Sequence, residues 1–179
     1  ASGAASAKLL LPYHPDHALA EQQEHVAAEV LAECRRVGIP LVLEPLFFGL
    51  ADPHDRPDVV LRTAERFAAL GPDLLKLPFP VDTTAEPDPD AWAEHCRAIT
   101  DRCPMPWAIL SGGGSFDDFA SQGAVATAAG CSGFMVGRAL WGEAARAAPA
   151  DRHAVIAEIV LPRWHRLCEI TTTSRKVHR

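Results

Sequence analysis

The sequence has few basic residues, no long hydrophobic run and no paired cysteines, and each absence excludes a class of protein. The 17 Lys and Arg residues are outnumbered by 23 Asp and Glu residues, giving a net charge of −6. This balance argues against a nucleic-acid-binding surface, which needs a basic face. The one basic stretch, residues 174–179, is interpreted as a frayed end rather than a binding arm.

Membrane and export signals are also missing from the sequence. No apolar run reaches the roughly 20 residues of a membrane span, and no charged start leads into the hydrophobic core of a signal peptide. We therefore expect a cytoplasmic protein with neither a membrane nor a nucleic-acid partner. The five cysteines are scattered without a C-x-x-C pair, which is typical of reduced thiols. The densest histidine cluster, residues 14–17, is interpreted as a turn, so no metal site is expected.

Patterns typical of strands and helices alternate five times along the chain, which favours a parallel α/β fold. Of the 179 residues, 48% are hydrophobic, enough for one domain spanning residues 1–179. The second strand is expected to end at Pro45. Strands are expected at residues 8–13, 41–44, 73–80, 106–111 and 133–136. Helices are expected at residues 18–37, 57–70, 89–102, 115–129 and 151–170.

The spacing between successive strands predicts a (β/α)8 TIM barrel. Neighbouring strands are about 26 to 36 residues apart, close to the roughly 31 residues per unit of an eight-unit barrel. Five units cannot close such a barrel, because the strand number fixes its circumference. We therefore expect the last five βα units, with the first three absent. Either the chain is part of a longer one or a partner covers two open edges, and we expect a homo-oligomer.

Lys76 is the most informative residue. It lies within a short apolar run closed by prolines, where strand alternation places it on one face with Leu74 and places Leu75 and Leu77 on the other. Burial disfavours the ammonium form, and a neutral amine can attack a carbonyl to form a Schiff base. The alternative is a structural lysine that extends to solvent at a strand end.

Two further charged residues stand on neighbouring strands. Glu44 ends an apolar strand, where it could serve as a general acid/base or as a partner for an arginine or a helix start. Lys8 opens the first strand and could be a second cation near Lys76, which would favour a neutral amine. Its alternative is a solvated lysine at the start of a strand.

Two glycine-rich turns follow the last two strands. Backbone N–H groups can approach an anion closely in such turns, and the loops after strands seven and eight of a barrel often bind phosphate. Each turn by itself could also be a simple tight turn. The candidate phosphate-binding residues are Ser111, Gly112, Gly113, Gly137 and Arg138.

Five ordered motifs resemble those of the class I (Schiff-base) aldolases, in particular tagatose 1,6-bisphosphate aldolase and its relative sulfofructosephosphate aldolase. The motifs are Ala7-Lys8-Leu9-Leu10, Leu43-Glu44-Pro45, Leu74-Leu75-Lys76, Leu110-Ser111-Gly112-Gly113 and Gly137-Arg138-Ala139-Leu140. The resemblance implies cleavage of a phosphorylated ketose to dihydroxyacetone phosphate and an aldehyde, with no metal or organic cofactor. It implies that Lys76 forms the Schiff base, Glu44 is the acid/base and Lys8 is a second active-site lysine. It further implies that Ser111, the glycines after it and Arg138 bind the ketose C1-phosphate.

The resemblance also implies an aspartate from the first barrel strand, which this sequence does not contain. Two rival hypotheses follow from the same residues. The chain could be a non-catalytic barrel remnant that binds phosphates or pairs with another subunit. It could also be a phosphate-binding barrel isomerase, although that reading gives no reason for a mid-strand lysine with a glutamate one strand earlier.

Overall fold

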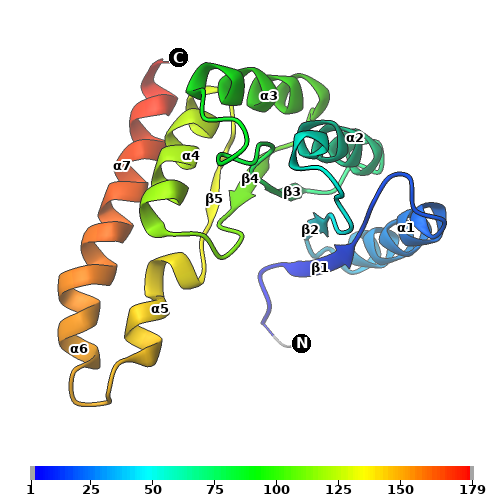
Figure 1. Cartoon of the computed structure of the whole chain (residues 1–179). Coiled ribbons are helices and arrows are strands. Elements are labelled where there is room, and N and C mark those ends of the chain that lie inside the picture. Colours follow the sequence, from blue (N-terminus) through cyan, green and yellow to red (C-terminus); the bar gives the residue numbers. More distant parts are fainter. Residues whose placement is uncertain (1–2, 178–179) are drawn as a thin grey trace.

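The computed structural model describes residues 3–177, with side chains up to residue 172, so the side chains of the basic segment 174–179 lie outside the described residues. One parallel sheet has the order β1-β2-β3-β4-β5 (Figure 1). Its strands are β1 (Ala7–Pro12), β2 (Leu41–Leu46), β3 (Leu74–Pro78), β4 (Trp107–Leu110) and β5 (Gly133–Met135). The predicted parallel α/β fold is confirmed.

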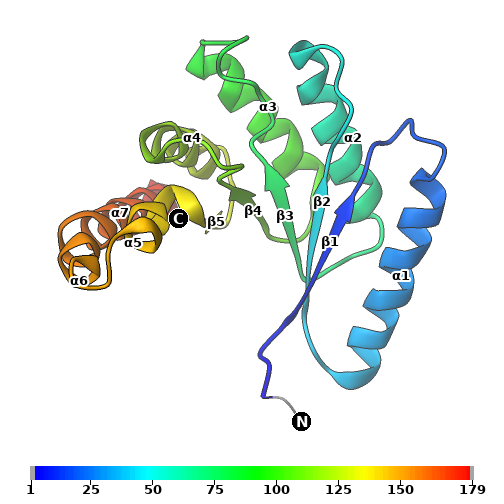
Figure 2. The same ribbon diagram turned by 60° about the horizontal axis from the view of Figure 1, so that its bottom comes forward.

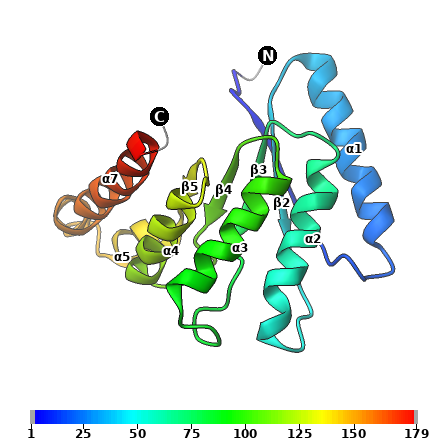
Figure 3. The same cartoon turned by 90° about the horizontal axis from the view of Figure 1, so that it is seen from above.

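Helices connect the strands and cover one face of the sheet. Figures 2 and 3 show α1 to α4 along that face, whereas the other face carries no helix from the described part of the chain. The helices are α1 (Ala20–Val37), α2 (Arg56–Ala68), α3 (Pro89–Arg102), α4 (Phe116–Ala128), α5 (Arg138–Arg146), α6 (Arg152–Val155) and α7 (Leu161–Val177). A 3-10 turn at Pro53–Asp55 precedes α2, and a π-helical segment at Ile156–Val160 joins α6 to α7.

Strand alternation separates the covered face from the open face. In β3, Leu75 and Leu77 are fully buried, whereas Leu74 and Lys76 are only partly buried. Leu75 and Leu77 belong to the core between sheet and helices, together with Phe67. The face that carries Lys76 is therefore the open face, as the alternation predicts.

Three details differ from the sequence-based expectation. The helix expected at residues 151–170 is interrupted by the π-helical segment Ile156–Val160 and continues to Val177. Pro45 lies inside β2 rather than ending it. The recorded pairing of β2 with β3 covers only Val42 and Leu43, so the missing N–H of Pro45 falls where β2 pairs with β1 alone. The helix Arg138–Arg146 was not expected, because its Gly-Arg start has the composition of a turn.

Gly130 stands at a tight junction between α3 and α4. Its φ is +99°, and a Cβ there would lie 2.6 Å from Cγ2 of Thr100. Thr100 cannot easily move, because its hydroxyl donates to the carbonyl of Ala129 at 2.7 Å and accepts from the Trp107 indole at 3.1 Å.

We therefore expect Gly130→Ala to lower the free energy of unfolding by roughly 2–4 kcal/mol through backbone strain and overpacking. Chemical denaturation measures the change. The matched control is Gly123→Ala inside α4, where an added Cβ meets nothing within 4 Å and helix propensity predicts a gain of about 0.5–1 kcal/mol. Equal effects of the two substitutions would contradict this account.

Candidate functional site

One carboxylate joins two lysines on the open face of the sheet. Glu44 Oε1 accepts a hydrogen bond from Lys76 Nζ at 2.8 Å, and Glu44 Oε2 accepts one from Lys8 Nζ at 2.8 Å. The exposed fractions of the side chains are 6% for Glu44, 15% for Lys76 and 50% for Lys8. The three residues come from β2, β3 and β1, so the contact ties three strands together at one point.

The strand register explains how these residues meet. Val42 pairs with Leu74, so Glu44 lies beside Lys76 on the same face two residues further along. Lys8 pairs with Val42, one row earlier, and its long side chain extends forward to Glu44. A lysine at the start of a strand can therefore reach a site near the strand ends.

The charge state of Glu44 follows from two opposing effects. Burial by itself raises the pKa of this carboxyl, but hydrogen bonds and charge from Lys76 and Lys8 outweigh burial and hold the pKa below its ordinary value. Glu44 is therefore a carboxylate at neutral pH.

The glycine-rich turn after β4 has a backbone conformation that favours glycine. Gly112 and Gly113 have φ values of +55° and +87°, which favour glycine. The Gly114 N–H closes the turn by donating to the Ser111 carbonyl at 3.1 Å. Arg138 is the first residue of α5, and its Nη2 lies 3.6 Å from the place a Cβ on Gly113 would take.

The two turns and the charged pair line a single pocket of about 380 Å³. Of the predicted site residues, Lys8 alone is not part of its lining, and it joins the site through Glu44. Glu44 is the one carboxylate among the described lining residues, and Arg138 makes no ion pair with a described side chain. The pocket therefore combines an amine, a carboxylate and a guanidinium that has no ion pair with a described side chain. Its lining residues are Glu44, Lys76, Leu110, Ser111, Gly112, Gly113, Met135, Val136, Gly137, Arg138 and Trp141.

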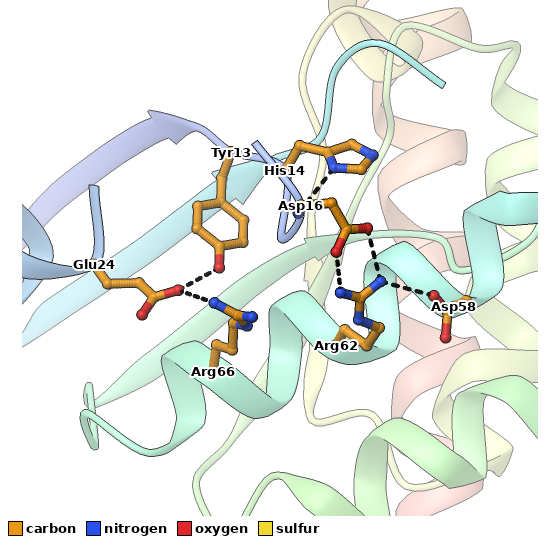
Figure 4. A network of polar contacts seen from close by, with 7 residues as sticks. All are labelled: Tyr13, His14, Asp16, Glu24, Asp58, Arg62 and Arg66. Carbon is orange, nitrogen blue, oxygen red and sulfur yellow. Dashed lines mark hydrogen bonds and ion pairs between the residues drawn. The ribbon is translucent and has the colours of Figure 1, made fainter. Parts of the chain in front are cut away.

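A polar network fixes the loop after β1 against α1 and α2 (Figure 4). The buried Tyr13 hydroxyl donates to Glu24 at 2.5 Å, and Arg66 donates to the same carboxylate oxygen at 2.9 Å. Burial and the Glu24 contact raise the pKa of Tyr13 well above its ordinary range. Arg62 binds both Asp16 and Asp58. Sequence reasoning missed this network, since its one local signal is the i,i+4 spacing of the last pair.

The histidine cluster at residues 14–17 forms a turn, in which His17 N–H donates to the His14 carbonyl at 3.0 Å. Within the described residues, no group of three or more His, Cys, Asp or Glu side chains could hold a metal ion. None of the described helices is both long and apolar enough to cross a membrane.

Curated relatives of this chain include tagatose 1,6-diphosphate aldolases from Listeria monocytogenes (strain HCC23) and Listeria innocua (strain CLIP 11262). Each is 29% identical over 169 residues, covering 79% of this chain. The match covers 49% of each relative, so the chain spans about half the length of the curated relatives it matches.

Solved structures show the same fold at low identity. An archaeal fructose-1,6-bisphosphate aldolase, with its catalytic lysine bound to a carbinolamine intermediate, has a TM-score of 0.67 at 18% identity. The fructose-bisphosphate aldolase of Plasmodium falciparum has a TM-score of 0.76, also at 18% identity. These likenesses cover 94% of this chain but 59% and 57% of those proteins. They confirm the predicted partial barrel.

The depressed pKa of Glu44 makes a testable contribution to stability. Its folded pKa lies below the ordinary value of 4.5, so the contribution is complete above that value and is lost as the pH falls through the folded pKa. We expect Glu44→Gln to lower the free energy of unfolding near neutral pH by about 1–3 kcal/mol. The difference from the wild type should shrink on acidification, as followed by denaturation at several pH values. Glu29→Gln on the surface of α1 is the control, and a pH-independent deficit for Glu44→Gln would contradict the assignment.

A family model supplies the last comparison. The model described as DeoC/LacD family aldolase matches residues 1–143, a range that holds Lys8, Glu44, Lys76 and both glycine-rich turns. Because this match covers most of the sequence, the chain belongs to the DeoC/LacD aldolase family.

Proposed function

We propose that this chain carries the Schiff-base site of a class I aldolase that cleaves a phosphorylated ketose, of the tagatose 1,6-bisphosphate kind, to dihydroxyacetone phosphate and an aldehyde. The observation that carries the proposal is the Glu44 carboxylate at 2.8 Å from Lys76 in a pocket shared with two glycine-rich turns and Arg138. The names of the Listeria relatives support this substrate class.

Glu44 and Lys76 would form the imine. Lys76 transfers a proton to Glu44 and attacks the ketone carbon with its free electron pair, giving a carbinolamine. Glu44 returns the proton to the carbinolamine hydroxyl, which leaves as water, and the nitrogen forms a protonated imine with the substrate. Lys8 contacts the other oxygen of the same carboxylate; it would hold Glu44 in place and bind substrate hydroxyls.

The protonated imine is the electron sink for carbon–carbon cleavage. As the C3–C4 bond breaks, its electron pair moves toward the imine nitrogen to give an enamine, and the C4 hydroxyl loses its proton to become the aldehyde. Protonation of the enamine at C3 and hydrolysis of the imine then release dihydroxyacetone phosphate and restore Lys76. An aspartate from the first barrel strand, implied by the family resemblance, would complete the proton transfers from outside this chain.

The two glycine-rich turns would hold the C1-phosphate. Gly112 and Gly113 leave their backbone N–H groups unobstructed, and Arg138 adds a charge that no described carboxylate neutralises. Binding energy at the phosphate would then orient the ketone against Lys76. A sulfofructose phosphate would fit the same mechanism, since it has the same C1-phosphate and C2 ketone and differs from the tagatose ester only at C4 and at the distal end.

Reduction with borohydride in the presence of dihydroxyacetone phosphate should trap a covalent adduct, which peptide mass analysis should place on Lys76. Lys76→Met should abolish the adduct, whereas Lys8→Met should lower its yield without moving it. An adduct that persists in Lys76→Met would overturn the assignment. Phosphate-ester binding without any adduct would instead support a non-catalytic remnant.

We expect Arg138→Met to weaken the binding of dihydroxyacetone phosphate by roughly ten- to hundredfold, because a charged hydrogen bond is lost. Isothermal calorimetry measures the change. Arg146→Met is the matched control, since Arg146 lies on the same helix but lines only the adjoining pocket. An equal loss in both variants would place the phosphate in that adjoining pocket.

A further inference from the structure

Two imidazoles and an exposed phenyl ring gather beyond the ends of β1 and β2. The ring centroid of Phe48 is 5.2 Å from that of His17 and 6.3 Å from that of His14. Phe48 is 38% exposed. We call these three residues the rim cluster. The mechanism above uses none of them.

The strand register places the rim cluster on the open face, above the charged pair. Leu10 pairs with Glu44 and Pro12 with Leu46, so two residues further along His14 meets Phe48, in agreement with their ring contact. Tyr13, which lies between Pro12 and His14 in sequence, points the opposite way toward α1 and α2 (Figure 4). Phe48 is four residues beyond Glu44 and two beyond the end of β2, so it stands at most about 13 Å further along the strand direction.

The glycine-rich turn after β4, here called the phosphate turn, lies on the other side of β3 from the rim cluster. It is equally far along the strand direction. Ala108 pairs with Lys76, and Gly112 is four residues beyond Ala108, just as Phe48 is four beyond Glu44. The rim cluster and the phosphate turn therefore flank the Lys76 strand, about 10 Å apart by strand spacing. A ketose held by its phosphate at Gly112 and by its ketone at Lys76 extends its remaining carbons toward the rim cluster.

The chemistry of the cluster suits hydroxyl groups on a carbon chain. His14 Nδ1 accepts from the Asp16 N–H at 3.2 Å, and His17 Nδ1 accepts from the Leu19 N–H at 3.2 Å. Nδ1 of each imidazole is therefore occupied, and an N–H at Nε2 is the group left to donate to a ligand oxygen. A phenyl ring beside these donors gives an apolar surface for C–H groups.

The surroundings of the cluster disfavour an anion. Asp16, Asp55 and Asp58 line a pocket of about 320 Å³ together with His14. The nearby cation, Arg62, is already bound by two of these carboxylates.

The other nearby guanidinium, Arg56, does not serve the open face. It lies 5.2 Å from the Phe47 ring and donates to the Phe79 carbonyl at 3.0 Å. Phe47 alternates with Phe48, so Arg56 is engaged on the covered side.

We propose that His14, His17 and Phe48 form a subsite for the uncharged, hydroxylated part of the substrate beyond the scissile bond. This inference rests on the proposed function for the placement of phosphate and ketone. The subsite selects substrates by the length and hydroxylation of the chain after C3. It does not supply the charge that would recognise a second phosphate or a sulfonate.

The test compares three ligands by isothermal calorimetry in the Lys76→Met background, so that the C3–C4 bond of the ligand is not cleaved during the measurement. The ligands are dihydroxyacetone phosphate, a ketohexose 1-phosphate and the corresponding 1,6-bisphosphate. His14→Ala and Phe48→Ala should each weaken both ketohexose esters by roughly three- to tenfold and by the same factor. Dihydroxyacetone phosphate, which has no carbon beyond C3, should bind unchanged. His25→Ala, an exposed histidine on α1, is the control and should change nothing.

Three outcomes would overturn the subsite. These are an equal loss for dihydroxyacetone phosphate, no loss for either ketohexose ester, or a loss confined to the bisphosphate, which would indicate charge recognition instead. The borohydride experiment on the wild-type chain separates this inference from the proposed function. It uses dihydroxyacetone phosphate alone, so a failure to trap an adduct would contradict the Schiff base of the proposed function. If the adduct forms but His14→Ala and Phe48→Ala bind the ketohexose esters as tightly as their parent does, only the subsite is contradicted.

Discussion

The site depends on one constraint, which is that a buried carboxylate must be paired. Glu44 is only 4% exposed, and an unpaired charge at such depth would be strongly unfavourable. Lys76 and Lys8 each occupy one of its oxygens. This pairing requires β1, β2 and β3 to keep a fixed register, since a shift by one residue would turn every side chain to the other face. The same contact that stabilises the sheet thus places an amine beside a base.

The parallel sheet brings the remaining parts of the site together. The turns after β4 and β5 begin at the carboxyl ends of the strands, and Glu44 and Lys76 lie close to the same edge of the sheet. Residues far apart in sequence therefore line one pocket. α5 follows directly from the second turn and holds Arg138 against Gly113. Glu44, Lys76 and the two glycine-rich turns therefore lie on or directly after four successive strands, β2 to β5, and rigid elements rather than long loops determine their spacing.

Much of this arrangement could be predicted from the sequence, because it depends on local periodicity. Alternation alone places Lys76 opposite Leu75, and glycines at the strand ends predict the turns. Contacts that depend on tertiary geometry could not be predicted. The binding of Asp16 by Arg62 joins residues 46 apart in sequence. α5 was missed because its first residues resemble a turn, and the strand position of Pro45 depends on which neighbour β2 pairs with.

The open face of the sheet determines how strong this chemistry can be. Leu10 is 44% exposed beside Glu44, and Lys8 is half exposed, so water reaches one side of the charged group. Both outer strands, β1 and β5, have a single partner among the described residues. Further strands at these edges would cover Leu10, exclude water and strengthen the ion pairs of Glu44, since electrostatic interactions grow as the local dielectric falls. The chain holds Lys76, Glu44 and the two glycine-rich turns in register, and covering this face would lower the dielectric around them.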